Sequence, residues 1–217
     1  MQAVRVESPP QIDGDVLNDA AWAQATPAAE FWQTRPYAGE PASEHTDVRV
    51  TFDATTLYVG VVCYDREPDH LVVSDARRDA PLDDTDSFQM IFDAFRDQQN
   101  GFVFGTNPAG IEYDGQLQND PTGSTFGGGG GGRFGGGSGG GFNVNWDGAW
   151  TVAAKTGDYG WSAEFAIPFA TLRYPQDEGA VWGLNFQRNI RRRNEVAFWS
   201  KLEQQWSLFR LANAGTL

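Results

Sequence analysis

The stretch Asp83-Asp84-Thr85-Asp86-Ser87-Phe88-Gln89-Met90-Ile91-Phe92-Asp93 decides the fold, because an acidic turn runs directly into a strand. Large apolar residues recur in it with period two, so they lie on one face of a pleat. Segment 101–107 repeats this pattern. Both strands carry an amide, Gln89 and Asn107, on the other face, which we expect to stay free of packing and to hold any ligand. The alternating apolar residues are Phe88, Met90, Phe92, Phe102 and Phe104.

The same alternation extends over most of the chain. It predicts an all-β, antiparallel β-sandwich of jelly-roll type with one or two short helical turns, in a single domain spanning residues 1–217. One helical turn is expected at 19–23, where Asn18 caps it and Trp22 is buried. The glycine-rich segment 127–141 is expected to be a flexible loop within the domain, because it has few side chains to bury. Further strands are predicted at 4–6, 48–53, 56–64, 111–116, 150–154, 161–167, 181–192 and 195–200.

Composition narrows the classes of function. The 217 residues carry 16 basic and 29 acidic side chains, a net charge of −13. This charge argues against nucleic acid and anionic membranes as partners, and it suits a neutral ligand or a bound cation. The single cysteine, Cys63, excludes an internal disulfide, and its strand position predicts a buried thiol. No apolar stretch approaches the roughly 20 residues of a membrane helix.

Catalytic signals are weak. His45 and His70 have no Ser or Cys in a recognisable motif, and the sequence does not place two carboxylates across a sugar. The glycine-rich segment 127–141 lacks the Lys-Ser/Thr pair and the helix of a phosphate-binding loop. We therefore expect no enzyme.

Acidic clusters at three turns could hold a hard cation, for which oxygen ligands are needed. The alternative is that these turns are simply solvated, since Asp is favoured in turns. If a calcium ion is bound, the expected ligands are Asp65, Asp69, Asp84 and Asp86.

The last strand pair offers a sugar platform. In segment 181–192 the even-numbered apolar residues pack, so the odd-numbered side presents a row of amides and arginines. On segment 195–200 we expect Val196 and Phe198 to pack, which leaves Trp199 facing away from the core. An outward Trp can stack on a sugar ring while planar groups bind hydroxyls; a solvated sheet face with a packed Trp is the alternative. The expected ligand-binding residues are Trp199, Gln89, Asn107, Asn185, Gln187 and Arg191.

Several motifs in order resemble a family 9 carbohydrate-binding module. The closest similarity is to the version found N-terminal to bacterial outer-membrane β-barrel proteins of unknown function. The motifs are Ile12-Asp13-Gly14 with Trp22, Leu57-Tyr58-Val59 leading to Asp65, Asp86-Ser87-Phe88-Gln89, Asn107-Pro108-Ala109-Gly110, Gly160-Trp161-Ser162-Ala163-Glu164-Phe165-Ala166-Ile167-Pro168, and Trp182-Gly183-Leu184-Asn185 with Trp199.

The resemblance implies a calcium-containing, non-catalytic sandwich that is exported, acts in the periplasm or at the cell surface after signal peptide removal, and binds a glycan or polysaccharide. It implies a C-terminal outer-membrane barrel as a further partner. Sugar binders of the family clamp a glycan between two Trp, and Trp199 resembles one of them. The other Trp is expected shortly before Asp86, where this sequence has Asp83 and Asp84, and Gly105 stands where the family has an Arg. Trp32 or Trp146 would complete the clamp by reaching the same cleft; otherwise the domain is an interaction or structural domain that has lost sugar binding.

Overall fold

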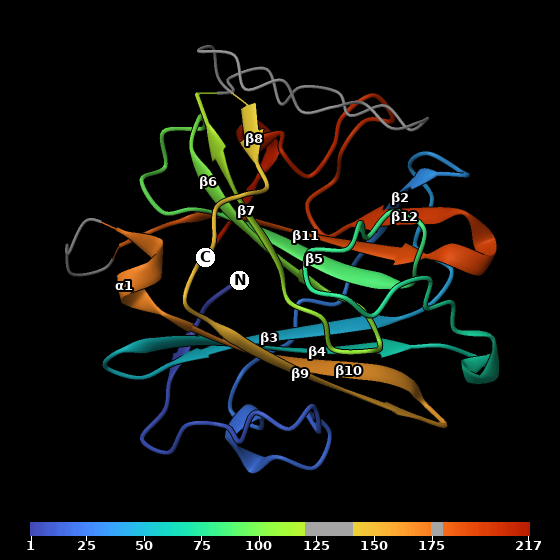
Figure 1. Cartoon of the computed structure of the whole chain (residues 1–217), viewed down its shortest axis with the longest axis horizontal. Helices are drawn as coiled ribbons and strands as arrows, with labels where there is room; N and C mark the ends of the chain where they lie inside the picture. Colours follow the sequence, from blue (N-terminus) through green and yellow to red (C-terminus); the bar gives the residue numbers. More distant parts are fainter. Residues whose placement is uncertain (120–140, 175–179) are drawn as a thin grey trace.

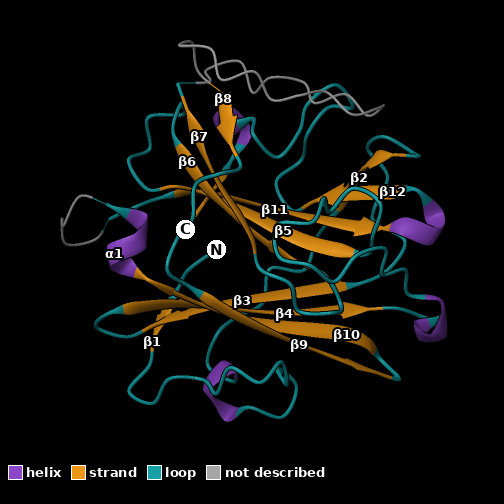
Figure 2. Ribbon diagram, in the orientation of Figure 1, coloured by secondary structure: helices purple, strands orange, loops and turns teal. Residues whose placement is uncertain are grey.

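Two β-sheets stack face to face in the computed structural model, which describes residues 1–119, 141–174 and 180–217 (Figures 1 and 2). The first sheet has the order β1 (Val4–Arg5), β3 (Thr46–Phe52), β4 (Thr56–Tyr64), β10 (Gly160–Pro168) and β9 (Thr151–Gly157). The second has the order β2 (Trp32–Arg35), β12 (Glu195–Phe198), β11 (Gly183–Ile190), β5 (Ser87–Asp93), β6 (Gly101–Thr106), β7 (Tyr113–Gln118) and β8 (Gly141–Asn143), with β13 (Gly215–Thr216) paired to β11. Short helical turns join them: η1 (Ala20–Trp22), η2 (Pro68–His70), α1 (Phe169–Leu172), η3 (Arg191–Arg193) and η4 (Leu211–Asn213).

The predicted antiparallel sandwich is confirmed. In the described part of the chain, β1 and β3 are the one parallel strand pair. The predicted glycine-rich loop 127–141 lies, apart from its last residue, outside the described residues. Residues 26–46, which carry no strand pattern in sequence, include β2 at the edge of the second sheet.

The core between the sheets is built from the alternating residues. Side chains of β5, β6 and β11 meet those of β4 and β10, and Phe88 contacts Phe165 and Phe186 at ring centroid distances of 6.1 and 5.5 Å. Burying one such ring stabilises the fold by about 1.5–3 kcal/mol. Cys63 is buried here as predicted, and burial raises the pKa of its thiol to about 12. Other members are Val59, Val61, Met90, Phe92, Phe104, Trp161, Ala163, Ile167 and Leu184.

The N-terminal turn is fastened to the outer face of the first sheet. Asp19, not the predicted Asn18, caps η1 by accepting the Ala21 backbone N–H at 2.8 Å. Trp22 is buried as expected, and Gly60 makes room for it, since a Cβ there would lie 2.9 Å from the Trp22 ring. The buried carboxylate of Glu164 accepts the indole N–H of Trp22 at 2.8 Å. Burial raises the pKa of this carboxyl group.

The outer face of the second sheet is also packed, so the prediction that the Gln89 and Asn107 face stays free is wrong. Segments 71–86 and 200–211 cross it, and every residue of β5 is buried. Ile91 on this face belongs to a second apolar cluster, in which the covering segment contributes Leu202, Leu208 and Leu211. The other members are Val103, Leu117, Phe142, Val196 and Phe198.

Candidate functional site

Two of the predicted amides, Asn107 and Asn185, make hydrogen bonds within the chain. Asn107 is fully buried; its Nδ2 donates to the Asp75 carbonyl at 2.8 Å, and its Oδ1 accepts the Ala109 N–H at 2.9 Å. Asn185 accepts the Ser200 N–H at 2.8 Å and donates to the Ser200 carbonyl at 3.1 Å. Because both ends of each amide are engaged, these side chains fix the segments that cross the outer face.

Trp199 faces the core, opposite to the prediction. Its ring lies 5.5 Å from that of Phe186 and covers Gly215, where a Cβ would come within 2.5 Å of the indole. Val196 and Phe198 lie instead on the outer face, because the returning segment 200–211 supplies apolar partners for them there. The alternation along β12 is real, but the face assigned to each residue is reversed.

The other two tryptophans do not form a second stacking wall. The Trp146 ring packs on Phe102 and Phe104 at centroid distances of 5.1 and 6.0 Å, on the core side of β6. Trp32 pairs in register with Phe198 at the sheet edge, and the Lys201 ammonium lies 3.7 Å from its ring centroid. Neither Trp146 nor Trp32 therefore completes a clamp with Trp199.

Gln89, Gln187 and Arg191 remain nearest to the predicted role. Gln89 and Gln187 face each other across β5 and β11, so their Cβ atoms are about 5 Å apart. Gln187 donates to Asn189 Oδ1 at 2.9 Å, whereas the Gln89 side chain, 8% exposed as a residue, has no hydrogen bond among the described residues. Arg191 is one-third exposed and pairs with Asp84 at 3.2 Å.

Leu82 covers the same face beside these amides. A Cβ on Gly105 would lie 2.7 Å from Leu82 Cδ1 and 2.9 Å from Gln89 Cγ. Ser87 and Asn189 both donate to the Leu82 carbonyl, at 3.0 and 2.9 Å. The loop is thus pinned by backbone and side chain, and the sequence had no local signal that assigned Leu82 to this place.

The four carboxylates predicted to bind calcium do not converge on one point. Asp65 accepts from Glu67 N–H and from the Arg192 guanidinium. Both oxygens of Asp86 accept backbone N–H groups, and burial raises the pKa of this carboxyl. Asp69 is exposed on η2, and Asp84 pairs with Arg191. In the part of the chain that the structure describes, no group of three or more acidic, His or Cys side chains has a metal-binding arrangement, so these residues do not fit a calcium site.

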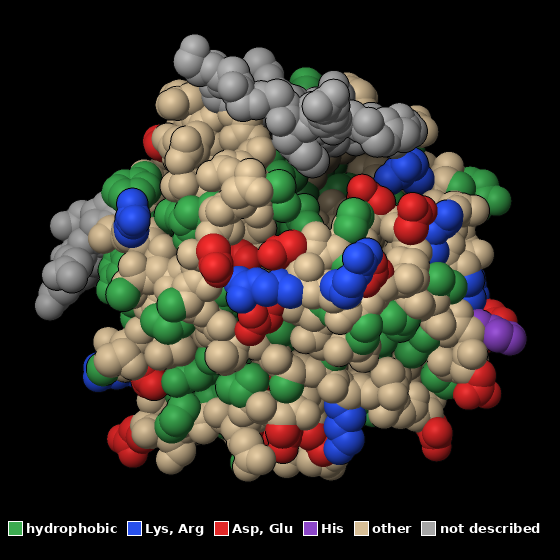
Figure 3. Space-filling view, viewed as in Figure 1, with side chains coloured by type: hydrophobic (Ala, Val, Ile, Leu, Met, Phe, Trp, Pro, Cys, Tyr) green, Lys and Arg blue, Asp and Glu red, His purple; other side chains and the backbone are tan. Residues whose placement is uncertain are grey.

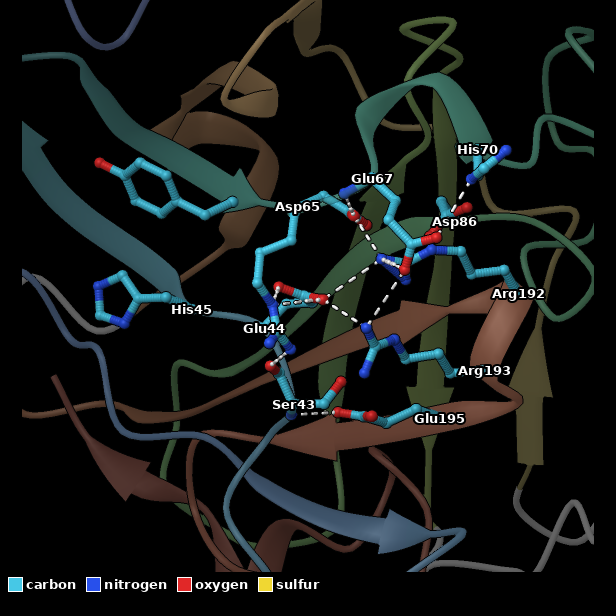
Figure 4. A network of polar contacts seen from close by, with 12 residues as sticks. Ser43, Glu44, His45, Asp65, Glu67, His70, Asp86, Arg192, Arg193 and Glu195 are labelled. Carbon is cyan, nitrogen blue, oxygen red and sulfur yellow. Dashed lines mark hydrogen bonds and ion pairs between the residues drawn. The ribbon is translucent and has the colours of Figure 1, made fainter.

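A network of charged residues occupies that end of the sandwich instead (Figure 4). Buried Glu44 accepts from Arg66 at 3.1 Å, from Arg193 at 2.9 Å and from Arg192 at 3.3 Å. Arg192 also reaches Asp65 and thereby joins η3 to the end of β4. Carboxylates as deeply buried as those of Glu44 and Asp65 stay charged in a fold only when they are paired with cations.

Arg188 was missed because it interrupts the apolar side of β11. It is 1% exposed and donates to the His45 carbonyl at 2.7 Å, Thr46 Oγ1 at 2.8 Å and the Tyr64 carbonyl at 2.6 Å. It therefore ties the second sheet to the first. A lone Arg among alternating apolar residues is the signal that could have revealed it.

Other classes of site find little support. Within the described segments, His45 and His70 contact the carboxylates of Asp47 and Glu67 rather than a Ser or Cys side chain. Basic side chains lie directly beside acidic ones in the middle of the face shown in Figure 3. Among the described residues, no helix is long and apolar enough to cross a membrane.

Comparisons with known proteins agree with the fold. The family model described as carbohydrate family 9 binding domain-like matches residues 12–206. A carbohydrate-binding module of family 9 from Caldicellulosiruptor kristjanssonii in complex with cellotriose superposes with a TM-score of 0.62 at 15% identity, over 99% of this chain and 90% of that one. A complex with glucose gives 0.60 at 16%, over 99% and 94%. A candidate carbohydrate-binding protein from Bacteroides uniformis gives 0.64 at 11%, over 99% and 96%. No curated protein matches the sequence.

Proposed function

The chain belongs to the carbohydrate family 9 binding domain-like family, and we propose that it binds glycans without acting on them catalytically. The observation that carries the proposal is the family match over residues 12–206, supported by a fold shared with modules that hold cellotriose and glucose. An extracytoplasmic location is part of the same proposal, and fractionation of cells that produce the native protein tests it.

The proposed glycan contacts are Gln89, Gln187 and Arg191, on the outer face of the second sheet. Three facts support this choice. The two amides are neighbours across β5 and β11, the Gln89 side chain has no hydrogen bond to any described residue, and Arg191 keeps a third of its side chain exposed. Planar amides and a guanidinium bind vicinal hydroxyls well, because their donors and acceptors lie in one plane. Trp199, Asn107 and Asn185 would support the fold rather than touch sugar.

Calorimetric titration with glucose and cellotriose tests the proposal, comparing the wild type with the Gln89→Ala/Gln187→Ala double variant. We expect the wild type to bind saturably and the double variant to bind with an affinity lower by about tenfold or more, since two hydrogen bonds of about 1 kcal/mol each are lost. Gln24→Ala is the matched control, because Gln24 is exposed next to η1 on the far side of the sandwich. Absence of binding to any glycan by the folded wild type would refute the function.

A second candidate is an interaction or structural domain of an outer-membrane protein whose sugar site is closed. The packing of Leu82 over Gly105 favours it, since this loop occupies the face beside Gln89. Leu82→Ala distinguishes the two. If the wild type binds no glycan and Leu82→Ala does, the site is closed by the loop, whereas glycan binding by the wild type rules out this candidate.

A further inference from the structure

A cavity of about 430 Å³ is lined by Arg173 at the end of α1, by the start of β6 and by the end of β7. We call it the mouth pocket. Its volume lies in the range of small-molecule sites, about 300–1,000 Å³. The residues that matter below are Phe95, Asp97, Asn100, Gln116, Gln118 and Arg173, all of which line it.

The mouth pocket is separate from the proposed contacts on the outer face. Gln116 pairs in register with Phe102, whose ring belongs to the core, so Gln116 projects from the inner face of the sheet. Gln89 projects from the outer face. Gln89 lies four residues before the end of β5 at Asp93, about 13 Å at the rise of a strand, and Phe95 lies in the turn beyond that end. A ligand ring cannot touch both.

Phe95 supplies an aromatic surface to the pocket. It is 52% exposed, although burying a ring of this size would stabilise the fold. An isolated exposed aromatic is ordinary on a protein surface. This one lines a cavity together with planar amides, and that combination is what a sugar ring needs: a flat apolar face for its C–H groups and in-plane donors and acceptors for its hydroxyls.

The amides are oriented in advance. Gln118 Nε2 donates to Gln116 Oε1 at 2.7 Å, which leaves Gln116 Nε2 as a donor and Gln118 Oε1 as an acceptor without another partner among the described residues. Arg173 likewise has no ion pair in the described part of the chain and is exposed. Gln116 and Arg173 thus each offer a donor group to a ligand, and Gln118 offers an acceptor.

Two carboxylates hold the turn that carries Phe95. The Asp93 carboxylate accepts the N–H groups of Asp97 and Gln98 at 3.2 and 2.8 Å. Asp97 accepts the N–H groups of Gln99 and Asn100, both at 2.8 Å, and the Asn100 side-chain amide. A platform fixed in this way loses little entropy when it binds a ligand.

Strained backbone gathers at the same place. Of the six non-glycine residues with positive φ in the described chain, four lie in or beside the pocket. They are Arg96 (φ 55°), Gln98 (φ 60°), Asn119 (φ 49°) and Arg173 (φ 44°). Such conformations concentrate at ligand sites, where the surrounding structure enforces them.

We propose that the mouth pocket is a second carbohydrate site, in which Phe95 stacks on one neutral sugar ring and Gln116, Gln118 and Arg173 bind its hydroxyls. This inference rests on the proposed function. A neutral ring is favoured because the lining carries one carboxylate, Asp97, and one guanidinium, Arg173, and because the net charge of −13 repels anions.

NMR titration with glucose and cellotriose tests this, with the side-chain amide signals of Gln116 and Gln118 as readout, assigned from the Gln116→Ala and Gln118→Ala variants. We expect saturable shifts in the wild type. The affinity obtained from them should fall at least about fivefold in Phe95→Ala, which is the equivalent of one aromatic contact, and should recover in Phe95→Trp. Tyr37→Ala is the matched control, since Tyr37 is 69% exposed near the far edge strand β2.

The outcomes separate the two proposals. Glycan binding that leaves Gln116 and Gln118 unshifted and is unchanged in Phe95→Ala overturns the mouth pocket and keeps the function. Failure of every glycan to bind overturns both. Binding that is lost in Phe95→Ala and unaffected by Gln89→Ala/Gln187→Ala supports the mouth pocket and removes the outer-face assignment.

Discussion

Replacing Arg192 by Ala tests whether the charged network at the end of β4 holds the sandwich together. Arg192 is 13% exposed by side chain and reaches Asp65 and Glu44, whose side chains are 1% and 3% exposed. In the variant, Glu44 retains Arg66 and Arg193. Asp65 retains the Glu67 N–H at 2.8 Å. The buried charge of Asp65 would then lack a cation.

Breaking a buried ion pair from one side costs about 3–5 kcal/mol. We expect the low end, about 3 kcal/mol, because both carboxylates keep other donors. Domains are stable by about 5–15 kcal/mol, so this loss is a large share. With a urea slope of about 2–3 kcal/mol/M, the midpoint should fall by about 1 M or more.

Urea unfolding followed by the fluorescence of the eight tryptophans measures the shift. Arg77→Ala is the control, because Arg77 pairs with Asp75 at the surface with 85% of its side chain exposed, and its midpoint should stay near the wild type. Adding Asp65→Asn to Arg192→Ala should restore about 1–2 kcal/mol, since the unpaired charge is gone. The reasoning fails if Arg192→Ala shifts the midpoint no further than Arg77→Ala, or if Asp65→Asn destabilises the Arg192→Ala variant further.

Three more predictions follow from the same contacts. Burial raises the pKa values of Asp86, Asp93, Asp114 and Glu164, so these groups bind protons more tightly in the folded state than in the unfolded chain. The stability gained from this tighter proton binding is fully present below the pKa values of the unfolded chain, and it is lost as pH rises through the pKa values of the folded protein. The urea midpoint should therefore be higher at pH 5 than at pH 7, and an unchanged or lower midpoint at pH 5 would contradict this. Gly60→Ala should destabilise the fold by about 1–3 kcal/mol, since the new Cβ would lie 2.9 Å from the Trp22 ring, which Glu164 holds in place. Gly141→Ala should be neutral, because a Cβ at Gly141 would have nothing within 4 Å. Equal thermal midpoints in the two variants would disprove this prediction. EGTA should leave the thermal midpoint unchanged, because the Asp65, Asp84 and Asp86 oxygens already accept from protein donors; a drop of several degrees that calcium reverses would restore the calcium site.

The fold could be predicted from the sequence because the alternation of apolar and polar residues recurs in strand after strand. Phe88, Met90 and Phe92 lie in the core as their spacing predicts, and so do Trp161 and Phe165 on β10. Alternation could not tell which side of β12 faces inward, since Val196 and Ala197 are both apolar enough to be buried. Segment 200–211 decided that by covering one side, and it carries no alternating pattern of its own.

The candidate site was harder to predict from the sequence, because it depends on contacts between segments that are far apart along the chain. Gln89 and Gln187 were assigned to the correct face by parity. Whether that face is open depends on Leu82, which reaches it from a loop without a periodic pattern. The mouth pocket was missed for a related reason: Phe95 and Gln116 are ordinary in isolation and become a candidate site only when β7 and the β5–β6 turn meet.

Strand glycines were the signal that could have anticipated the covered face. A glycine inside a strand often marks the close approach of another group. Gly60 lies under Trp22, Gly105 under Leu82 and Gly215 under Trp199. Gly105 stands on the face predicted to bind sugar and Gly215 under the Trp predicted to stack, so both argued for packing there rather than for a ligand. Gln89 pairs in register with Gly105 and is only 8% exposed, so in the proposed pair it is the half-buried Gln187 that keeps more of its surface for a glycan.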